Sequence, residues 1–117
     1  MDEGMDYYRQ GDVLIQREND LQIGSATEVM ADAHGRLVLA EGEVTGHSHA
    51  ILERPGIALY NLAGGDKALV IDPARIYGEG GVVVAHEEHA AIMLPPGRYR
   101  VTRQREYTPH AIRRVQD

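Results

Sequence analysis

The chain of 117 residues contains no cysteine, no phenylalanine and no tryptophan. Without cysteine it cannot contain a disulfide, a thiolate metal site or a cysteine nucleophile. The same absence fits a reducing compartment, so we expect a cytoplasmic protein. Without phenylalanine or tryptophan, the core has to be built from aliphatic side chains and some of the six tyrosines.

Two further absences concern membranes and nucleic acids. No apolar run approaches the roughly 20 residues of a membrane-spanning helix. Residues 1–6 are acidic and polar, and they lack the basic and apolar segments of a secretory signal. We therefore expect no membrane association. The formal net charge of −6 argues against general affinity for nucleic acid.

Basic residues are concentrated near the C-terminus, where Glu106 and Asp117 are the acidic residues that oppose them. This distribution predicts ion pairs between a basic strand and its neighbours, or a site for an anion or an acidic partner. The basic residues of this segment are Arg98, Arg100, Arg103, Arg105, Arg113 and Arg114.

Short apolar, β-branched segments separated by glycine and proline predict an all-β fold. We expect residues 1–10 to be a flexible lead-in and residues 11–117 to form a single domain. Residues 21–33 are ambiguous and predict irregular structure or an edge strand. The expected strands are 12–17, 36–40, 48–53, 57–62, 67–71, 82–85, 90–94 and 98–107, with 112–115 a short last strand or a tail.

No amphipathic helix interrupts these segments, so the pattern predicts a single small antiparallel β-barrel or sandwich. In the strand 98–107, the odd positions carry Tyr99, Val101 and Tyr107, which we expect to face the core. A small domain without disulfides can gain stability by associating with a second copy, and the open edges of its sheets can pair with those of that copy. We therefore expect a homo-oligomer, most simply a homodimer.

The chemistry of the chain centres on His47 and His49, which are two residues apart. If this stretch is extended, both imidazoles point to one face, and Glu53 shares that face. Imidazole and carboxylate groups bind zinc, iron, manganese or nickel, and residue types do not separate these metals. The alternative is that both histidines lie at a polar turn after Gly46.

A second pair, His86 and His89, follows the apolar run 82–85. On a strand these two face opposite ways, so one of them could join the site, and we favour His86 because it closes the apolar run. On a single helical turn they would share a face, with a glutamate between them orienting an imidazole. The alternative is a solvated connection between strands.

The spacing His47-x-His49-x-x-x-Glu53 resembles the first motif of the cupin family, in which two histidines and a glutamate bind a metal inside a β-barrel. Pro95-Pro96-Gly97 resembles the Pro-x-Gly turn of the second cupin motif. The resemblance implies a cupin-like barrel and a metal site with ligands His47, His49 and Glu53, and we expect His86 as a fourth ligand from its position after the apolar run. The departures are that Gly42 and Gly56 lie too close to the motif, and that Arg100 stands where cupins place the fourth ligand, a histidine.

A second resemblance carries no function. The run Gln10-Gly11-Asp12-Val13-Leu14-Ile15, with Gln104-Arg105-Glu106-Tyr107 near the end, is similar to small uncharacterised bacterial and phage proteins.

These features predict a small metal-binding β-barrel that acts on or binds a small polar or anionic molecule through a histidine-centred site. Arg103 and Arg105 share the inward face of their strand and could hold a carboxylate of the ligand. Alternatively they form structural ion pairs with Glu41 or Glu43, or lie exposed. The competing function is a non-enzymatic β-module for protein interaction or self-assembly, and the sequence does not decide whether the protein is an enzyme.

Overall fold

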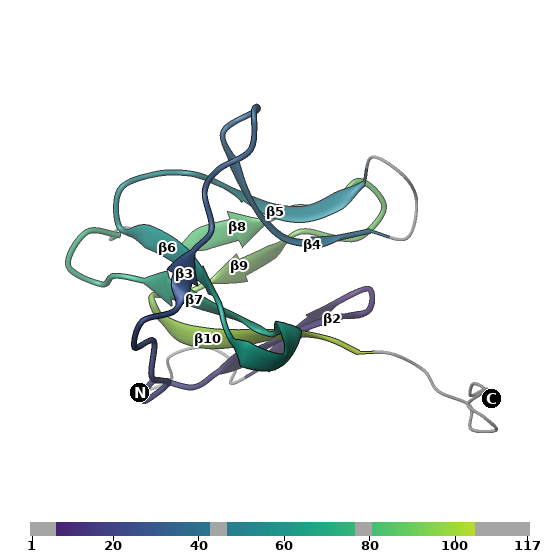
Figure 1. Ribbon diagram of the computed structural model, residues 1–117. Coiled ribbons are helices and arrows are strands. Elements are labelled where there is room, and N and C mark those ends of the chain that lie inside the picture. Colours follow the sequence, from purple (N-terminus) through teal and green to yellow (C-terminus); the bar gives the residue numbers. More distant parts are fainter. Residues whose placement is uncertain (1–6, 43–46, 77–80, 105–117) are drawn as a thin grey trace, which may run out of the picture.

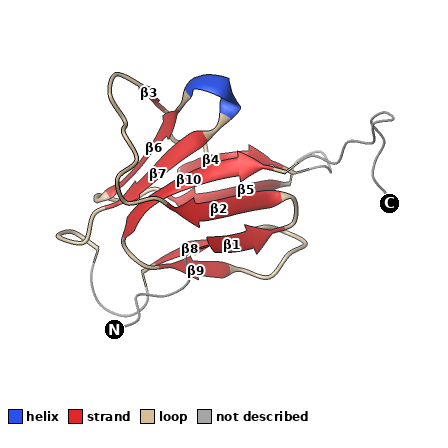
Figure 2. Cartoon of the chain, turned by 90° about the horizontal axis from the view of Figure 1, so that it is seen from below, coloured by secondary structure: helices blue, strands red, loops and turns tan. Residues whose placement is uncertain are grey.

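The computed structural model describes residues 7–42, 47–76 and 81–104, and its strands form two layers (Figure 1). The first layer is a six-stranded antiparallel sheet with the order β1-β2-β10-β7-β6-β3 (Figure 2). Its strands are β1 (Tyr7–Gln10), β2 (Val13–Arg17), β3 (Thr27–Glu28), β6 (Ile57–Asn61), β7 (Lys67–Ile71) and β10 (Gly97–Arg103).

The second layer consists of two antiparallel pairs. β4 (Arg36–Glu41) pairs with β5 (Ser48–Leu52), and β8 (Val82–Val84) pairs with β9 (Ile92–Leu94). Ala50 and Ala85 exchange both backbone hydrogen bonds, at 3.0 and 2.9 Å, and this bridge joins the two pairs.

The all-β, antiparallel prediction is confirmed. Within the described ranges the sheets do not close into a barrel, so the arrangement is a sandwich. The described part has no α-helix, and its one 3₁₀ turn is η1 (Ala63–Gly65). None of its helices is long and apolar enough to cross a membrane.

The N-terminal segment corrects one expectation. Tyr7–Gln10 is not a lead-in but the edge strand β1, paired with β2 from Tyr7↔Gln16 to Gln10↔Val13. Burial alternates along it, with Tyr8 and Gln10 inward, so a partner strand stabilises a segment with little apolar character of its own. Residues 1–6, the expected strand 112–115 and Tyr107 lie outside the described residues.

Tyr99 takes the place in the core that a phenylalanine or tryptophan would have filled. Its side chain is fully buried, and the ring of Tyr8 meets it edge-on with centroids 6.3 Å apart. Its hydroxyl donates to the Pro95 carbonyl at 2.6 Å and accepts from Arg17 at 2.9 Å. Val101 is buried on the same face, which confirms the inward direction predicted for these two residues of β10.

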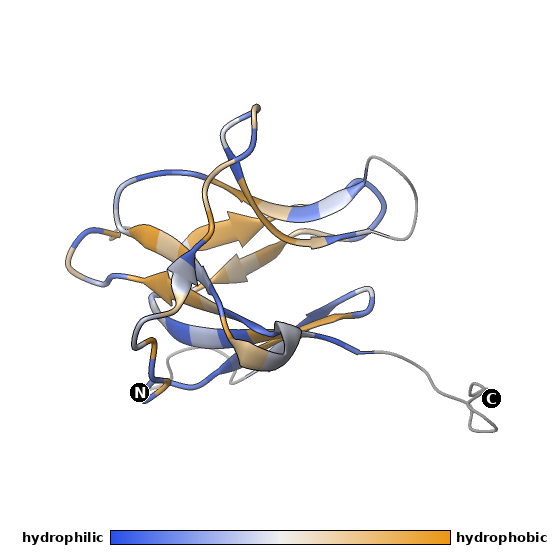
Figure 3. Ribbon diagram, in the orientation of Figure 1, coloured by the Kyte–Doolittle hydropathy of each residue, from blue (hydrophilic) through white to orange (hydrophobic). Residues whose placement is uncertain are grey.

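Aliphatic side chains from both layers complete the core. Leu59 on β6 and Leu69 on β7 are opposite each other and fully buried, and Val84 on β8 is buried in the other layer. Hydrophobic residues are concentrated on the strands of both layers, most evenly along β8 (Figure 3).

We predict that Leu59→Ala lowers the free energy of unfolding by about 2–5 kcal/mol, because it leaves a cavity in the core. Denaturant unfolding of the full chain measures this value. Met30→Ala is the control: Met30 is 75% exposed, so its removal should change stability by less than about 0.5 kcal/mol. Equal effects of the two substitutions would contradict the packing described here.

Candidate metal centre

Four imidazoles lie together at one end of the sandwich. His47 and His49 come from the start of β5, and His86 and His89 come from the connection between β8 and β9. Ring centroids are 4.3 Å apart for His49 and His86, 4.7 Å for His86 and His89, and 5.8 Å for His47 and His86. We call these four residues the histidine cluster, and His86 is at its centre.

Two glycines leave room for the cluster. A Cβ on Gly42, at the end of β4, would lie 2.8 Å from His86 Nε2 and 3.1 Å from His47 Cβ. A Cβ on Gly11, in the turn between β1 and β2, would lie 2.7 Å from His89 Nε2. Both distances are too short for a larger residue unless the imidazole moves.

Gln10, at the end of β1, fixes the orientation of His49. Its side-chain nitrogen donates to the carbonyls of Val84 at 3.1 Å and Ala90 at 2.9 Å. Its side-chain oxygen is therefore the atom that lies 2.8 Å from His49 Nδ1, and it can only accept. His49 Nδ1 consequently carries the proton, and Nε2 of the neutral ring keeps its lone pair.

That lone pair faces a carboxylate. Asp12 Oδ1 lies 3.8 Å from His49 Nε2, which is too far for a hydrogen bond. Two metal–ligand bonds of about 2.1 Å can span up to about 4.2 Å, so an ion fits between these two atoms. Asp12 Oδ2 also lies 3.4 Å from Arg103 Nε, which keeps the carboxylate beside a positive charge.

The pKa of His49 is strongly lowered. Its side chain is 1% exposed, and this burial lowers its pKa to about 4, with further lowering by the nearby charge of His86. Asp12 acts in the opposite direction and only partly offsets the burial. His49 is therefore neutral near pH 7, the form in which imidazole binds a metal.

His47 and His86 have different surroundings. His47 Nδ1 is buried and forms no hydrogen bond with the described residues, and Glu88 Oε2 lies 3.4 Å from it. His86 Nδ1 accepts from the Glu88 amide at 3.0 Å, so coordination by the neutral ring through either nitrogen requires His86 to give up this bond. The ligand atoms of His47, His86 and Glu87 all lie within 4.8 Å of one another.

The expected ligand Glu53 is not brought to the cluster. It is exposed, and it follows β5 at the end of the hairpin where its amide donates to the Gly35 carbonyl. Four residues along a strand span about 13 Å, so sharing a face with His49 does not place Glu53 near its ring. Asp12 and Glu87 are the carboxylates at the cluster instead.

The two arginines expected to bind a substrate have separate outcomes. Arg103 lies at the cluster, where it pairs with Asp12 and donates to the backbone carbonyl of Glu41. The anticipated ion pair with a glutamate side chain is thus replaced by one with Asp12. Arg105, like Glu43, lies outside the described residues.

Sequence reasoning missed Gln10 and Asp12, and it preferred His86 to His89 where the structure brings both to the cluster. His89 was not selected because a regular strand would have turned it away from His86, whereas the observed connection is a bend. Gln10 and Asp12 belong to the run Gln10-Gly11-Asp12, whose turn glycine was the available signal.

The fold and the cluster together define a small antiparallel β-sandwich with four histidines between the ends of its layers. The chain belongs to a family described as a domain of unknown function, DUF8820, whose model matches residues 9–104. The matched range includes the whole cluster together with Gln10, Asp12 and Arg103. No curated protein and no solved structure matches the chain.

We predict that protein kept in chelator loses up to about 3 kcal/mol of stability between pH 6.5 and pH 4 through His49. Its folded-state pKa is lowered from 6.5 to about 4. Between these two pH values His49 is therefore protonated in the unfolded chain but neutral in the folded chain. Stability is therefore full above pH 6.5 and falls as the pH drops. Denaturant unfolding at several pH values measures this loss.

The variant His49→Gln should show a shallower decline over the same pH range. His34→Ala is the control, because His34 is an exposed turn residue and its removal should leave the decline intact. A decline in His49→Gln as steep as that of the wild type would show that other groups cause it.

Proposed function

We propose that the histidine cluster binds one divalent transition metal ion and that the bound ion holds a small polar or anionic molecule. The ligand atoms of His47, His86 and Glu87 already lie within 4.8 Å of one another. In the proposal His49 and Asp12 would have to approach these atoms to complete the site. The observation that carries the proposal is the lone pair of His49 Nε2, buried, fixed by Gln10 and separated from a carboxylate oxygen by 3.8 Å.

The donor set fits such an ion on two grounds. His47 Nδ1 is a buried atom to which no residue in the described part of the chain hydrogen-bonds, and a metal would provide a partner. His49 donates its other ring proton to Gln10, as metal-binding histidines donate theirs to an oxygen. Imidazoles with a carboxylate suit zinc, iron, manganese or nickel.

Arg103 gives the site its preference for anions. Its guanidinium lies at the cluster and is 29% exposed, so a ligand carboxylate can approach it without displacing the core. A bound ion would supply Lewis acidity toward an oxygen atom of that ligand. The proposal includes a cytoplasmic location, because a chain without cysteine fits a reducing compartment.

The cupin resemblance supports the proposal in part. His47 and His49, the two histidines of the first motif, both lie in the cluster, whereas Glu53 does not. Arg100, at the position of the fourth cupin ligand, pairs with Glu18 at 2.9 Å and Asp66 at 3.3 Å. The proposed cupin-like site therefore takes its remaining ligands, His86 and Asp12, from other segments.

The second candidate is an interaction module that assembles with itself as a homodimer. Val83 and Met93 are partners on β8 and β9, and they are 45% and 49% exposed. An exposed apolar pair at a sheet edge is a site where another chain can pack.

We predict that zinc or nickel raises the melting temperature of the full chain at neutral pH, and that His49→Ala removes most of this effect. A ligand that binds only the folded state stabilises it by about 2.7 kcal/mol at a hundredfold excess over its dissociation constant. The effect should fade below about pH 6, where imidazoles become protonated. Thermal unfolding with metal and with chelator measures it.

His34→Ala is the control and should retain the metal-dependent shift, because His34 lies in a turn outside the cluster. Equal melting temperatures of the wild type with metal and with chelator would overturn the proposal and favour the interaction module.

A matched pair of glycines tests the cluster without removing a ligand. Gly11 and Gly24 both have positive φ, at 60° and 58°, so replacement by alanine strains the backbone equally. A Cβ at Gly24 meets nothing within 4 Å, whereas a Cβ at Gly11 meets the end of His89. We predict similar losses of stability for Gly11→Ala and Gly24→Ala, with metal affinity reduced in Gly11→Ala alone.

Calorimetric titration with zinc, combined with denaturant unfolding of both variants, measures the two quantities. Unchanged metal affinity in Gly11→Ala would show that the metal does not bind on the side of the cluster where His89 lies.

A further inference from the structure

A groove of about 570 Å³ lies between β5 and β8, a volume within the usual range for small-molecule sites. The two strands are joined at Ala50 and Ala85. Continued antiparallel pairing would place Leu52 opposite Val83, but no backbone hydrogen bond joins these two residues. Strands β5 and β8 diverge beyond this bridge, and the groove lies between the diverging strands.

The groove is on the outer face of the second layer. Ser48, Ala50 and Leu52 alternate with His49 along β5, so they point away from the side that His49 occupies. Leu52 is 70% exposed and Val83 is 45% exposed, which leaves an apolar surface without a protein partner in the described part of the chain. From residue 50 to residue 54 the lining extends about 13 Å along the strand.

The two ends of the groove differ in charge. At one end are Arg36 and Arg54. Arg36 forms an ion pair with Asp32, whose Oδ2 lies 3.0 Å from Arg36 Nη2. Arg54 is exposed, and its side chain forms no ion pair or hydrogen bond with the described residues. Arg54 is therefore the cation available to a ligand.

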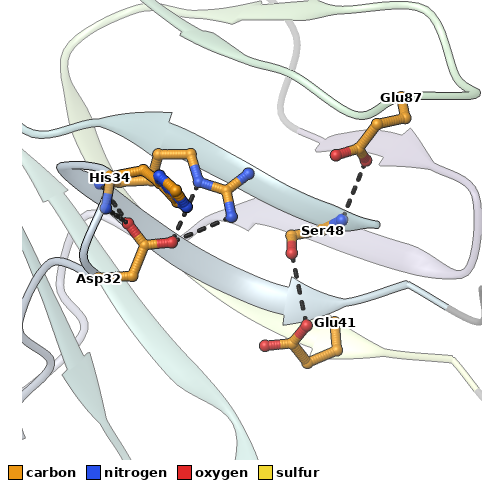
Figure 4. Close-up of polar contacts among 6 residues, drawn as sticks. Asp32, His34, Glu41, Ser48 and Glu87 are labelled. Atoms are coloured by element: carbon orange, nitrogen blue, oxygen red, sulfur yellow. Dashed lines mark hydrogen bonds and ion pairs between the residues drawn. The ribbon is translucent and has the colours of Figure 1, made fainter. Parts of the chain in front are cut away.

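The opposite end is acidic and polar. Glu87 accepts a hydrogen bond from the Ser48 amide at 3.0 Å, and the Ser48 hydroxyl donates to Glu41 at 3.4 Å (Figure 4). The carboxylates of Glu87 and Glu41 are therefore both at this end of the groove. A ligand anion is repelled from this end and attracted to the end where Arg54 lies.

We propose that this groove binds a small amphipathic carboxylate. The carboxylate group lies against the Arg54 guanidinium, and the apolar body lies along Leu52 and Val83 toward Ala85. A forked arginine–carboxylate contact supplies direction, and burial of the apolar body supplies affinity. The groove borders the histidine cluster, because His86 and Glu87 also line it, but carboxylate binding at Arg54 requires no metal ion.

The test is calorimetric titration of the full chain, in chelator, with octanoate and with octanamide. Octanamide keeps the alkyl chain and lacks the charge. The wild type should bind octanoate saturably at one site, and Arg54→Gln should weaken this binding at least tenfold. Val83→Asp should abolish it. Arg9→Gln, which removes an exposed arginine of β1 in the other layer, should leave it unchanged.

Three results would overturn the proposal. The first is an absence of saturable octanoate binding, and the second is octanoate binding that neither Arg54→Gln nor Val83→Asp changes. The third is a dimer in light scattering that Val83→Asp dissociates and octanoate does not, since a second copy would then cover the groove. A metal-dependent melting shift in any of these cases would still support the metal centre, so the two proposals fail independently.

Discussion

The side chain of Gln10 connects the two layers of the sandwich at the point where the histidines meet. It is 2% exposed, and its amide group reaches Val84, Ala90 and His49, all in the second layer, from a strand of the first. Loss of these bonds would leave buried polar groups unsatisfied, at about 1–3 kcal/mol each. Gln10 anchors the connection between β8 and β9 at Ala90, and the bond from the Ser48 amide to Glu87 anchors it from β5.

The same amide determines the chemical state of the site. Because Gln10 accepts a hydrogen bond from the protonated Nδ1 of His49, the Nε2 lone pair faces Asp12, and burial keeps the ring neutral. Arg103 balances the charge of Asp12 from the other side. A neutral imidazole beside a carboxylate is the combination of ligands that the proposed divalent ion requires.

The local pattern of the chain predicted the strands and part of the site. The apolar segment between two turns identified 67–71, which coincides with β7, and the expected strand 48–53 agrees with β5, which His47 directly precedes. The local pattern could not identify Gln10, whose contact with His49 spans 39 residues and depends on how the layers stack. It also misplaced Glu53, because periodicity gives the face of a strand but not the distance along it.

The central claim is that the histidine cluster holds a metal ion, and the metal content of untagged protein tests it most directly. Elemental analysis of the purified chain, loaded with zinc and then dialysed, should give about one equivalent per chain for the wild type. His49→Ala, which is expected to fold but lacks the imidazole that Gln10 orients, should retain far less. No bound metal in the wild type, or an equal amount in both proteins, would contradict the account.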